Sequence, residues 1–285
     1  MLKRSILHVD ETVWQILRRS DGKPATSDGR MWLVRSTHSE ENPFAYYRAT
    51  LTRSQPEAKL LLDGFVGYIQ TDGYQVYKNL DNMIQVGCWA HVRRKFNDVG
   101  FTTGLAAHAV IRCNKMFEVE RKINELKLNP NERLLKREEL LKPLMDEFYV
   151  WLDTIGECSG KLKEAVNYAL NQKESLYRML EDGRLQLSNN LAEQKIRPVA
   201  MGRKNYLFST SERGAAANAI AYTLIETAKL NGIIPYEYLK YLFTHLPNTD
   251  FRRHPQLLED FLPWSHNVKA LCTTKTPLPV ISLTA

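Results

Sequence analysis

The hydrophobic pattern of the first 90 residues predicts β-strands. Residues 5–17, 31–37 and 44–50 are rich in Val, Ile, Trp, Thr and Tyr, and a Gly-, Ser- and Asp-rich stretch separates the first two of these segments. Segments of this composition between turn signals are typical of strands. Because the connections are short, we expect the three strands to pair as an antiparallel meander.

Two more strands follow after a helix. Pro56 stands where the first turn of a helix tolerates proline, and we expect this helix to run to residue 65. Apolar runs at residues 66–70 and 84–90 predict strands, with a short amphipathic segment at residues 74–80 between them. Strands separated by helices usually pair in parallel through crossovers. The pattern therefore predicts an α/β fold whose mixed sheet has three antiparallel strands and then two parallel ones.

Helical spacing of apolar residues replaces the strand pattern beyond these segments. A first helix is predicted over residues 108–128, a second begins at Asn129 and kinks at Pro143, and a third ends at Gly183. Residues 105–185 are therefore expected to form an all-helical insertion.

The predicted elements divide the chain into five parts. The helix that begins near Asn190 is not expected to run normally through Pro198. The five parts are a sheet domain (1–104), the helical insertion (105–185), a segment that completes the sheet domain with one helix (186–213), a C-terminal helical element (214–264) and a loose tail (265–285).

Composition narrows the class of protein. The 285 residues are 44% hydrophobic and 25% charged, as in ordinary globular domains. No apolar run approaches the roughly 20 residues of a membrane helix, so we expect a cytoplasmic protein that does not engage a membrane. The formal net charge of +7 hints at a polyanionic partner. The basic clusters at residues 91–96 and 195–204 strengthen that hint, although most charge runs are solvated faces.

The four cysteines form no CxxC pair, which favours reduced thiols over disulfides. One zinc site can be written from Cys88, His91, His108 and Cys113. The alternative is two buried thiols and two unrelated histidines.

Two aspartates stand on predicted strands that could be neighbours. Asp72 follows the strand at residues 66–70, and Asp10 lies in the first strand. The strand order resembles a ribonuclease-H-like sheet, in which the first and fourth strands are parallel and about 4.8 Å apart. Two carboxylates this close repel unless a cation such as Mg²⁺ compensates them. The alternative for Asp72 is turn formation with Gly73.

A third acid is available in Glu193. It lies on the predicted helix near Asn190, where it could complete a site for a second ion. The alternatives are a capping interaction with Asn190 and an ion pair with Arg197, four residues further on.

Five motifs in order resemble the catalytic half of the insertion-sequence 66 family of bacterial transposases. The resemblance covers residues 6–264 and implies a ribonuclease-H-like fold with a three-acid (DDE) site, in which Asp10, Asp72 and Glu193 match the three acids. It also implies cleavage and strand transfer of DNA with two Mg²⁺ or Mn²⁺ ions. The motifs are HVDET, QTDGY, GCWAHVRRKF, NNLAEQKIRPVAMGRKNYLF and AYTLIETAKLNG.

The same resemblance gives the basic clusters a role, because cations near the metals could neutralise DNA phosphates. Trp89 and Tyr206 could stack on a base, although aromatic residues beside strands more often belong to the core. We also expect a homo-oligomer on DNA, and possible accessory proteins from the same element. The residues expected to contact DNA are His91, Arg93, Arg94, Lys95, Lys195, Arg197, Arg203 and Lys204.

Two other functions stay open. A metal-dependent nuclease of the same fold would cut without strand transfer, and an inactive remnant would only bind DNA. Relatives usually carry a long N-terminal DNA-binding region, whereas this sequence starts at the first catalytic strand. We therefore expect weak binding to DNA with little sequence preference, since phosphate contacts carry no sequence information directly.

Overall fold

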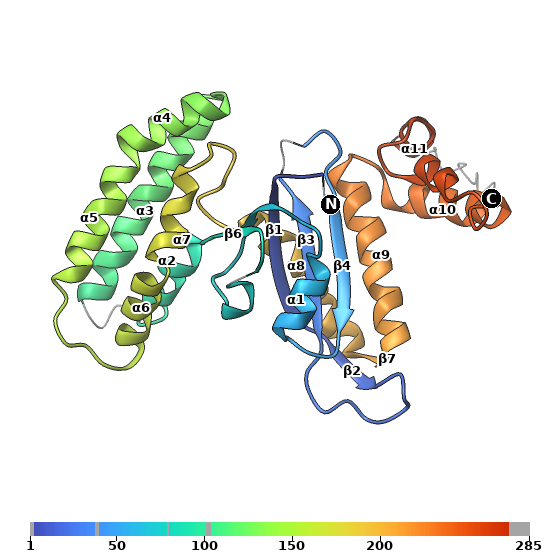
Figure 1. The fold of residues 1–285 in the computed structure, drawn as a ribbon, viewed down its shortest axis with the longest axis horizontal. Coiled ribbons are helices and arrows are strands. Elements are labelled where there is room, and N and C mark those ends of the chain that lie inside the picture. The colour runs from blue at the N-terminus through green and yellow to red at the C-terminus, as the bar shows by residue number, and fades with distance from the viewer. Residues whose placement is uncertain (1–2, 38–39, 79, 101–103, 274–285) are drawn as a thin grey trace, which may run out of the picture. The chain divides into compact units, whose positions relative to one another are not determined.

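The computed structural model describes residues 3–37, 40–78, 80–100 and 104–273. Five strands form a mixed sheet in the order β4-β3-β1-β5-β6, and β2 pairs with β7 in a second sheet (Figure 1). The strands are β1 (Ile6–Val13), β2 (Gln15–Arg18), β3 (Arg30–Ser36), β4 (Ala45–Thr50), β5 (Gly67–Gln70), β6 (Met83–Val86) and β7 (Phe208–Ser211). The predicted α/β class with a mixed sheet is confirmed.

Helices account for most of the remaining described residues. The α-helices are α1 (Gln55–Leu61), α2 (Trp89–Asn97), α3 (Gly104–Glu125), α4 (Pro130–Leu140), α5 (Lys142–Asp153), α6 (Gly160–Asn171), α7 (Lys173–Tyr177), α8 (Asn190–Tyr206), α9 (Glu212–Leu230), α10 (Pro235–His245) and α11 (His266–Cys272). The 3₁₀ helices are η1 (Gln75–Tyr77), η2 (Arg178–Leu180), η3 (Leu246–Asn248) and η4 (Pro255–Phe261).

The chain forms two compact units. The first unit contains residues 1–12 and 52–200, and the second contains residues 13–51 and 201–285. The division of the sequence into five parts stays a prediction.

The first unit contains three parallel strands. Strand β1 pairs in parallel with β5, so that His8 lies opposite Gln70, and β5 pairs in parallel with β6. Since β5 is the fourth strand expected from the sequence, its predicted parallel pairing with the first strand is confirmed.

Helices α2 to α7 form a bundle in the first unit (Figure 1). Between residues 104 and 180 the described chain contains helices and turns but no strand. Trp89 of α2 packs edge-on against Phe148 of α5, with 5.4 Å between ring centroids. This cluster continues to Ile6 of β1 and Val86 of β6. The helices are thereby attached to the strands through one continuous apolar core.

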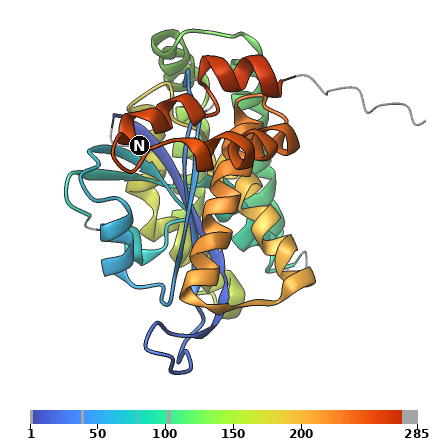
Figure 2. The ribbon, with the colours of Figure 1, turned by 90° about the vertical axis from the view of Figure 1, so that its right-hand side faces the viewer.

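In the second unit, α9 lies alongside β4 (Figures 1 and 2). The hydroxyls of Thr223 and Thr227 on α9 accept hydrogen bonds from the backbone N–H groups of Tyr47 and Ala45, at 2.9 and 3.1 Å. These two side chains satisfy backbone donors on the side of β4 that does not pair with β3.

The prediction of a single strand over residues 5–17 is wrong, because the strand is interrupted at Trp14. The Trp14 backbone N–H donates to the carbonyl of Gly29 at 2.9 Å, and its buried indole N–H donates to the Ser209 hydroxyl at 3.0 Å. Beyond this break, β2 joins the second sheet by pairing with β7. The partner of β2 is distant in sequence, so the local pattern does not reveal the change of sheet.

The strand expected over residues 84–90 ends at Val86, and Trp89 begins α2. A short apolar run fits a buried strand or a buried helix equally well. The Trp89 N–H donates to the carbonyl of Leu187 at 3.1 Å, which draws the chain away from the ladder. The amphipathic segment expected at residues 74–80 contains only the short helix η1.

The predicted start of a helix after Asn129 is confirmed by a capping box with Glu132. The kink expected at Pro143 is a complete break, since α4 ends at Leu140 and Pro143 lies in the first turn of α5. Proline lacks the N–H that would continue the hydrogen-bond ladder of the preceding helix. The helix expected to end at Gly183 is likewise divided, into α6, α7 and η2.

The tail expected to be loose begins with α11. The Ser265 hydroxyl caps this helix by accepting from the Val268 N–H, and Val268 and Cys272 are buried. These residues pack with Tyr238 of α10 in the core of the second unit. The remaining part of the tail, residues 274–285, lies outside the described residues.

Candidate active site

Asp10 lies on β1 in the first unit, and other acids of the same unit surround it. One of its oxygens accepts a hydrogen bond from the Glu11 backbone N–H at 2.8 Å. Burial and the negative charges of Glu11, Asp72 and Glu193 raise the pKa of Asp10 well above its ordinary value. The three acids singled out from the sequence therefore lie close enough to interact.

Asp72 follows β5 and forms a turn at the same time. Its Oδ1 accepts from the Tyr74 backbone N–H at 2.9 Å, so the turn interpretation is confirmed. Its Oδ2 lies 3.9 Å from Nη2 of Arg53. The Tyr168 hydroxyl of α6 donates to the Asp72 carbonyl. The turn therefore orients one carboxylate oxygen, while the other faces the Arg53 guanidinium.

The chain before α8 is fixed to the strands that carry the two aspartates. The Gln70 side chain donates to the Gln186 carbonyl at 2.7 Å and accepts from its N–H at 2.9 Å. The Asn189 amide donates to the Val9 carbonyl at 2.8 Å and lies 3.1 Å from His8 Nδ1. These contacts bring the start of α8, and with it Glu193, to Asp10.

The Glu193 side chain turns to α2. Its Oε2 accepts from Arg94 Nη2 at 2.8 Å, and its Oε1 lies 3.5 Å from His91 Nδ1. The sequence had left open a capping interaction with Asn190 or an ion pair with Arg197. The carboxylate contacts Arg94 and His91 instead. Pro198 lies inside α8, which continues through it to Tyr206.

His91 faces Glu193 as a neutral ring. Burial lowers the pKa of His91. Nη1 of Arg94 lies 3.3 Å from His91 Nε2, and since a guanidinium only donates, Nε2 accepts. The ring proton then lies on Nδ1, facing Glu193. Among the described residues, Nδ1 and Glu193 Oε1 are both buried without a hydrogen-bond partner.

The site also contains three residues that the sequence analysis missed. The Glu11 side chain is only 2% exposed and accepts from Arg53 Nε at 2.6 Å and from the Tyr77 hydroxyl. Burial raises the pKa of Glu11. The only signal in the sequence is that Glu11 adjoins Asp10, because its two partners come from segments 42 and 66 residues away.

The residues expected to contact DNA lie in both units. Two cavities of the first unit, one of about 580 Å³ beside Asp72 and one of about 620 Å³ beside Glu193, are lined by five of them: His91, Arg93, Arg94, Lys95 and Arg197. Arg94 lines both. His91, Arg93, Arg94 and Lys95 lie on α2, and Lys195 and Arg197 on α8, all in the first unit, while Arg203 and Lys204 lie on the part of α8 in the second unit.

The four-residue zinc site written from the sequence is wrong. Within the described residues, one His/Cys/Asp/Glu group has metal-ligand spacing, and it combines Cys88 and His91 with Glu193. His108 and Cys113 are not part of it. Burial raises the pKa of Cys88 and of Cys113 to about 12, so both thiols stay protonated at neutral pH.

Base stacking by Trp89 is excluded by burial, since only 1% of the residue is exposed. Tyr206 is 42% exposed. Its hydroxyl is hydrogen-bonded to that of Tyr222 within the second unit.

Comparisons with known proteins give the family of the chain. Residues 1–217 match the family model described as Transposase IS66 family, and residues 223–264 match the IS66 C-terminal element. No solved structure is significantly similar to the chain. No helix in the described residues is long and apolar enough to cross a membrane.

Curated relatives come from Sinorhizobium fredii (strain NBRC 101917 / NGR234). Uncharacterized protein y4qI is 31% identical over 92% of this chain and 51% of its own length. Uncharacterized protein y4hP is 31% identical over 90% of this chain and 50% of its own length. The chain thus spans about half the length of these relatives. The matches over residues 1–217 and 223–264 establish that the chain belongs to the Transposase IS66 family.

Proposed function

We propose that the chain carries the ribonuclease-H-like catalytic domain of a DDE transposase, and that Asp10, Asp72 and Glu193 are its three catalytic acids. The observation that carries the proposal is their convergence from β1, the end of β5 and α8. The charges of Asp72 and Glu193 both raise the pKa of Asp10. Such mutual repulsion in the metal-free protein is the arrangement that a bound cation relieves.

The donor chemistry of the three acids suits Mg²⁺ or Mn²⁺. Hard divalent cations prefer carboxylate oxygens, and Asp10 and Asp72 supply them. Glu193 offers Oε1, which is buried and has no hydrogen-bond partner among the described residues. Two such ions, when bound, stabilise the attacking and leaving oxygens of an in-line displacement at phosphorus.

The other groups of the site orient the acids and can bind DNA phosphates. Arg94 holds Oε2 of Glu193, whose Oε1 lies 3.5 Å from His91 Nδ1, and the Tyr74 N–H fixes Oδ1 of Asp72. Arg53 and Arg94 also place positive charge beside the acids, where it can neutralise DNA phosphates. Water attacks the DNA backbone first, and the freed 3′-hydroxyl then attacks the target strand, so no protein nucleophile is needed. Joining two element ends to one target needs two such sites, which supports a homo-oligomer on DNA.

A strand-transfer assay tests the proposal. The full chain is incubated with pre-nicked donor duplex that ends in a 3′-hydroxyl, with a target plasmid, and with Mg²⁺, Mn²⁺ or EDTA. We expect metal-dependent joining of donor to target. Metal-dependent cutting without joined product would favour the nuclease alternative, and neither product in the presence of DNA binding would favour an inactive remnant.

A further inference from the structure

The cavity beside Asp72 has a cationic wall, in which Arg53 and Arg94 contact the acids while the lysines do not line the acid cluster. It has a volume of about 580 Å³, and its lining includes Arg53, Lys78, Arg94 and Lys95. We propose that this cavity is a subsite for a backbone phosphate of the DNA strand that is cut, flanking the scissile phosphate. Arg53, Lys78 and Lys95 are its contacts. The inference rests on the proposed function and adds a defined part of the substrate to it.

Arg53 is preorganised at the inner end of the cavity. Its Nε and Nη2 contact Glu11, and its guanidinium lies 3.4 Å from the centroid of the Tyr74 ring. A guanidinium has five N–H donors in a fixed plane. Because Glu11 engages the Nε–Nη2 edge, the donors on Nη1 stay available to an anion. An arginine held in this way loses less side-chain entropy on binding a phosphate.

The outer wall carries two exposed lysines, Lys78 and Lys95. Four Lys and Arg side chains face two acids in the lining, Asp72 and Asp98, so positive charge is in excess. The aromatic faces are already covered, since Arg53 lies over Tyr74 and the Lys95 ammonium is 5.8 Å from the Tyr168 ring centroid. The chemistry therefore favours a phosphate over a stacked base.

The position of the cavity identifies the strand. Asp72 lines it, so a phosphate held there belongs to the strand that passes the acids. The second cavity adjoins Glu193, and its wall contains Arg93, Arg94 and Arg197. A strand that crosses the acids thus has cationic lining on both sides of the reacting phosphate.

Salt-dependent DNA binding in EDTA tests the subsite without involving cleavage. The double variant Lys78→Ala/Lys95→Ala is compared with Lys115→Ala/Lys163→Ala, which removes two exposed lysines from α3 and α6 that do not line the cavity. We expect the negative slope of log K against log salt to become shallower by about 1 to 2 for the first variant only. Equal slopes for both variants would overturn the subsite.

Acetylation of lysines in the wild-type protein gives a second test of the subsite. Bound duplex should slow the acetylation of Lys78 and Lys95, measured by mass spectrometry, and leave Lys115 and Lys163 unchanged. Unchanged modification of Lys78 and Lys95 at saturating DNA overturns the proposal. Because neither measurement needs catalysis, the subsite can fail while strand transfer is intact, and strand transfer can fail while the subsite is confirmed.

Discussion

Asp10→Asn, Asp72→Asn and Glu193→Gln are each expected to lower metal-dependent DNA cleavage by at least about 10³-fold. Each substitution keeps the size of the side chain and removes the charge that binds a divalent cation. The rate of single-strand cleavage of a labelled duplex in Mg²⁺, measured at saturating protein, gives the effect.

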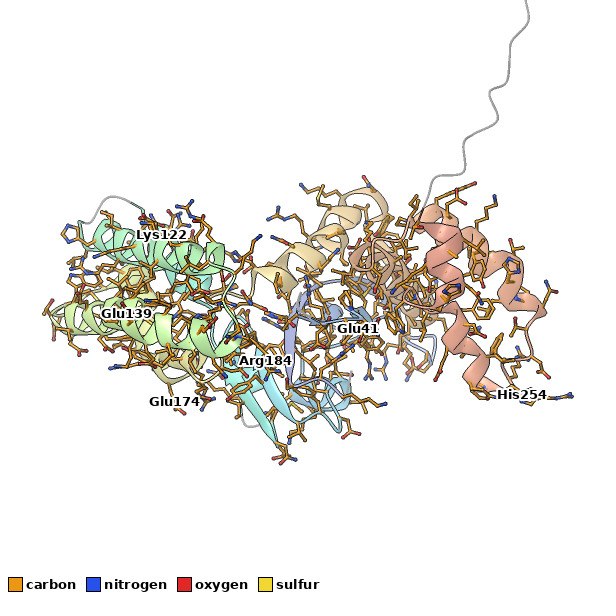
Figure 3. All side chains as sticks on the ribbon, turned by 90° about the horizontal axis from the view of Figure 1, so that it is seen from above. Glu41, Lys122, Glu139, Glu174, Arg184 and His254 are labelled. Atoms are coloured by element: carbon orange, nitrogen blue, oxygen red, sulfur yellow. The ribbon has the colours of Figure 1, made fainter. Side chains whose placement is uncertain are left out.

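A matched control separates loss of chemistry from loss of fold. Glu174, labelled in Figure 3, has an 84% exposed side chain that pairs with Arg178, so Glu174→Gln should cleave like the wild type. In EDTA, Asp10→Asn should unfold at no lower temperature than the wild type, because it removes a carboxylate that like charges oppose. Near-normal cleavage by Glu193→Gln would contradict a catalytic role for Glu193 and would mean that it is only a structural partner of Arg94.

Arg137→Met is expected to destabilise the first unit by about 3–5 kcal/mol, because the buried Glu120 carboxylate loses one of its two arginine partners, keeping Arg133, and the Leu185 carbonyl loses a buried donor. The Arg137 side chain is fully buried, and its Nη2 and Nε contact Glu120 at 2.5 and 3.0 Å. Nη2 also donates to the Leu185 carbonyl at 2.8 Å. Since Leu185 directly precedes the Gln186 contact with β5, we expect cleavage to fall together with stability. Urea unfolding measures the change.

The control for Arg137 is an exposed pair. Lys122, labelled in Figure 3, lies on α3 and pairs with Glu118, and both side chains are more than half exposed. Lys122→Ala should therefore cost no more than about 1 kcal/mol. A loss below that of Lys122→Ala would mean that Arg137 does not anchor the segment before α8.

Much of the fold is predictable because its signals are local. Alternating apolar runs and turn residues place β1 and β5, and the helix between the meander and β5 predicts their parallel pairing. The same reasoning places Asp10 and Asp72 on neighbouring strands. The Asp-Gly turn can also be predicted from the sequence. The structure shows that Asp72 forms this turn while its second oxygen faces Arg53.

The parts of the fold and of the site that could not be predicted depend on contacts between residues that are distant in sequence. Trp89 belongs to a helix because its N–H and ring find partners near residues 187 and 148, which no local window contains. The Glu11–Arg53 pair and the Gln70–Gln186 pair are of the same kind. The position of Glu193 follows from the second of these, so the sequence alone leaves its capping alternative open.

Binding of Mn²⁺ measured by isothermal titration calorimetry tests the central claim most directly, namely that Asp10, Asp72 and Glu193 form one cation site. The wild type is compared with Asp10→Asn/Asp72→Asn and with the control Glu174→Gln. The account predicts that the wild type and the control bind Mn²⁺ with the same affinity, and that the double variant loses this binding. Equal affinity in all three proteins would contradict it, since the cation would then bind away from the acids.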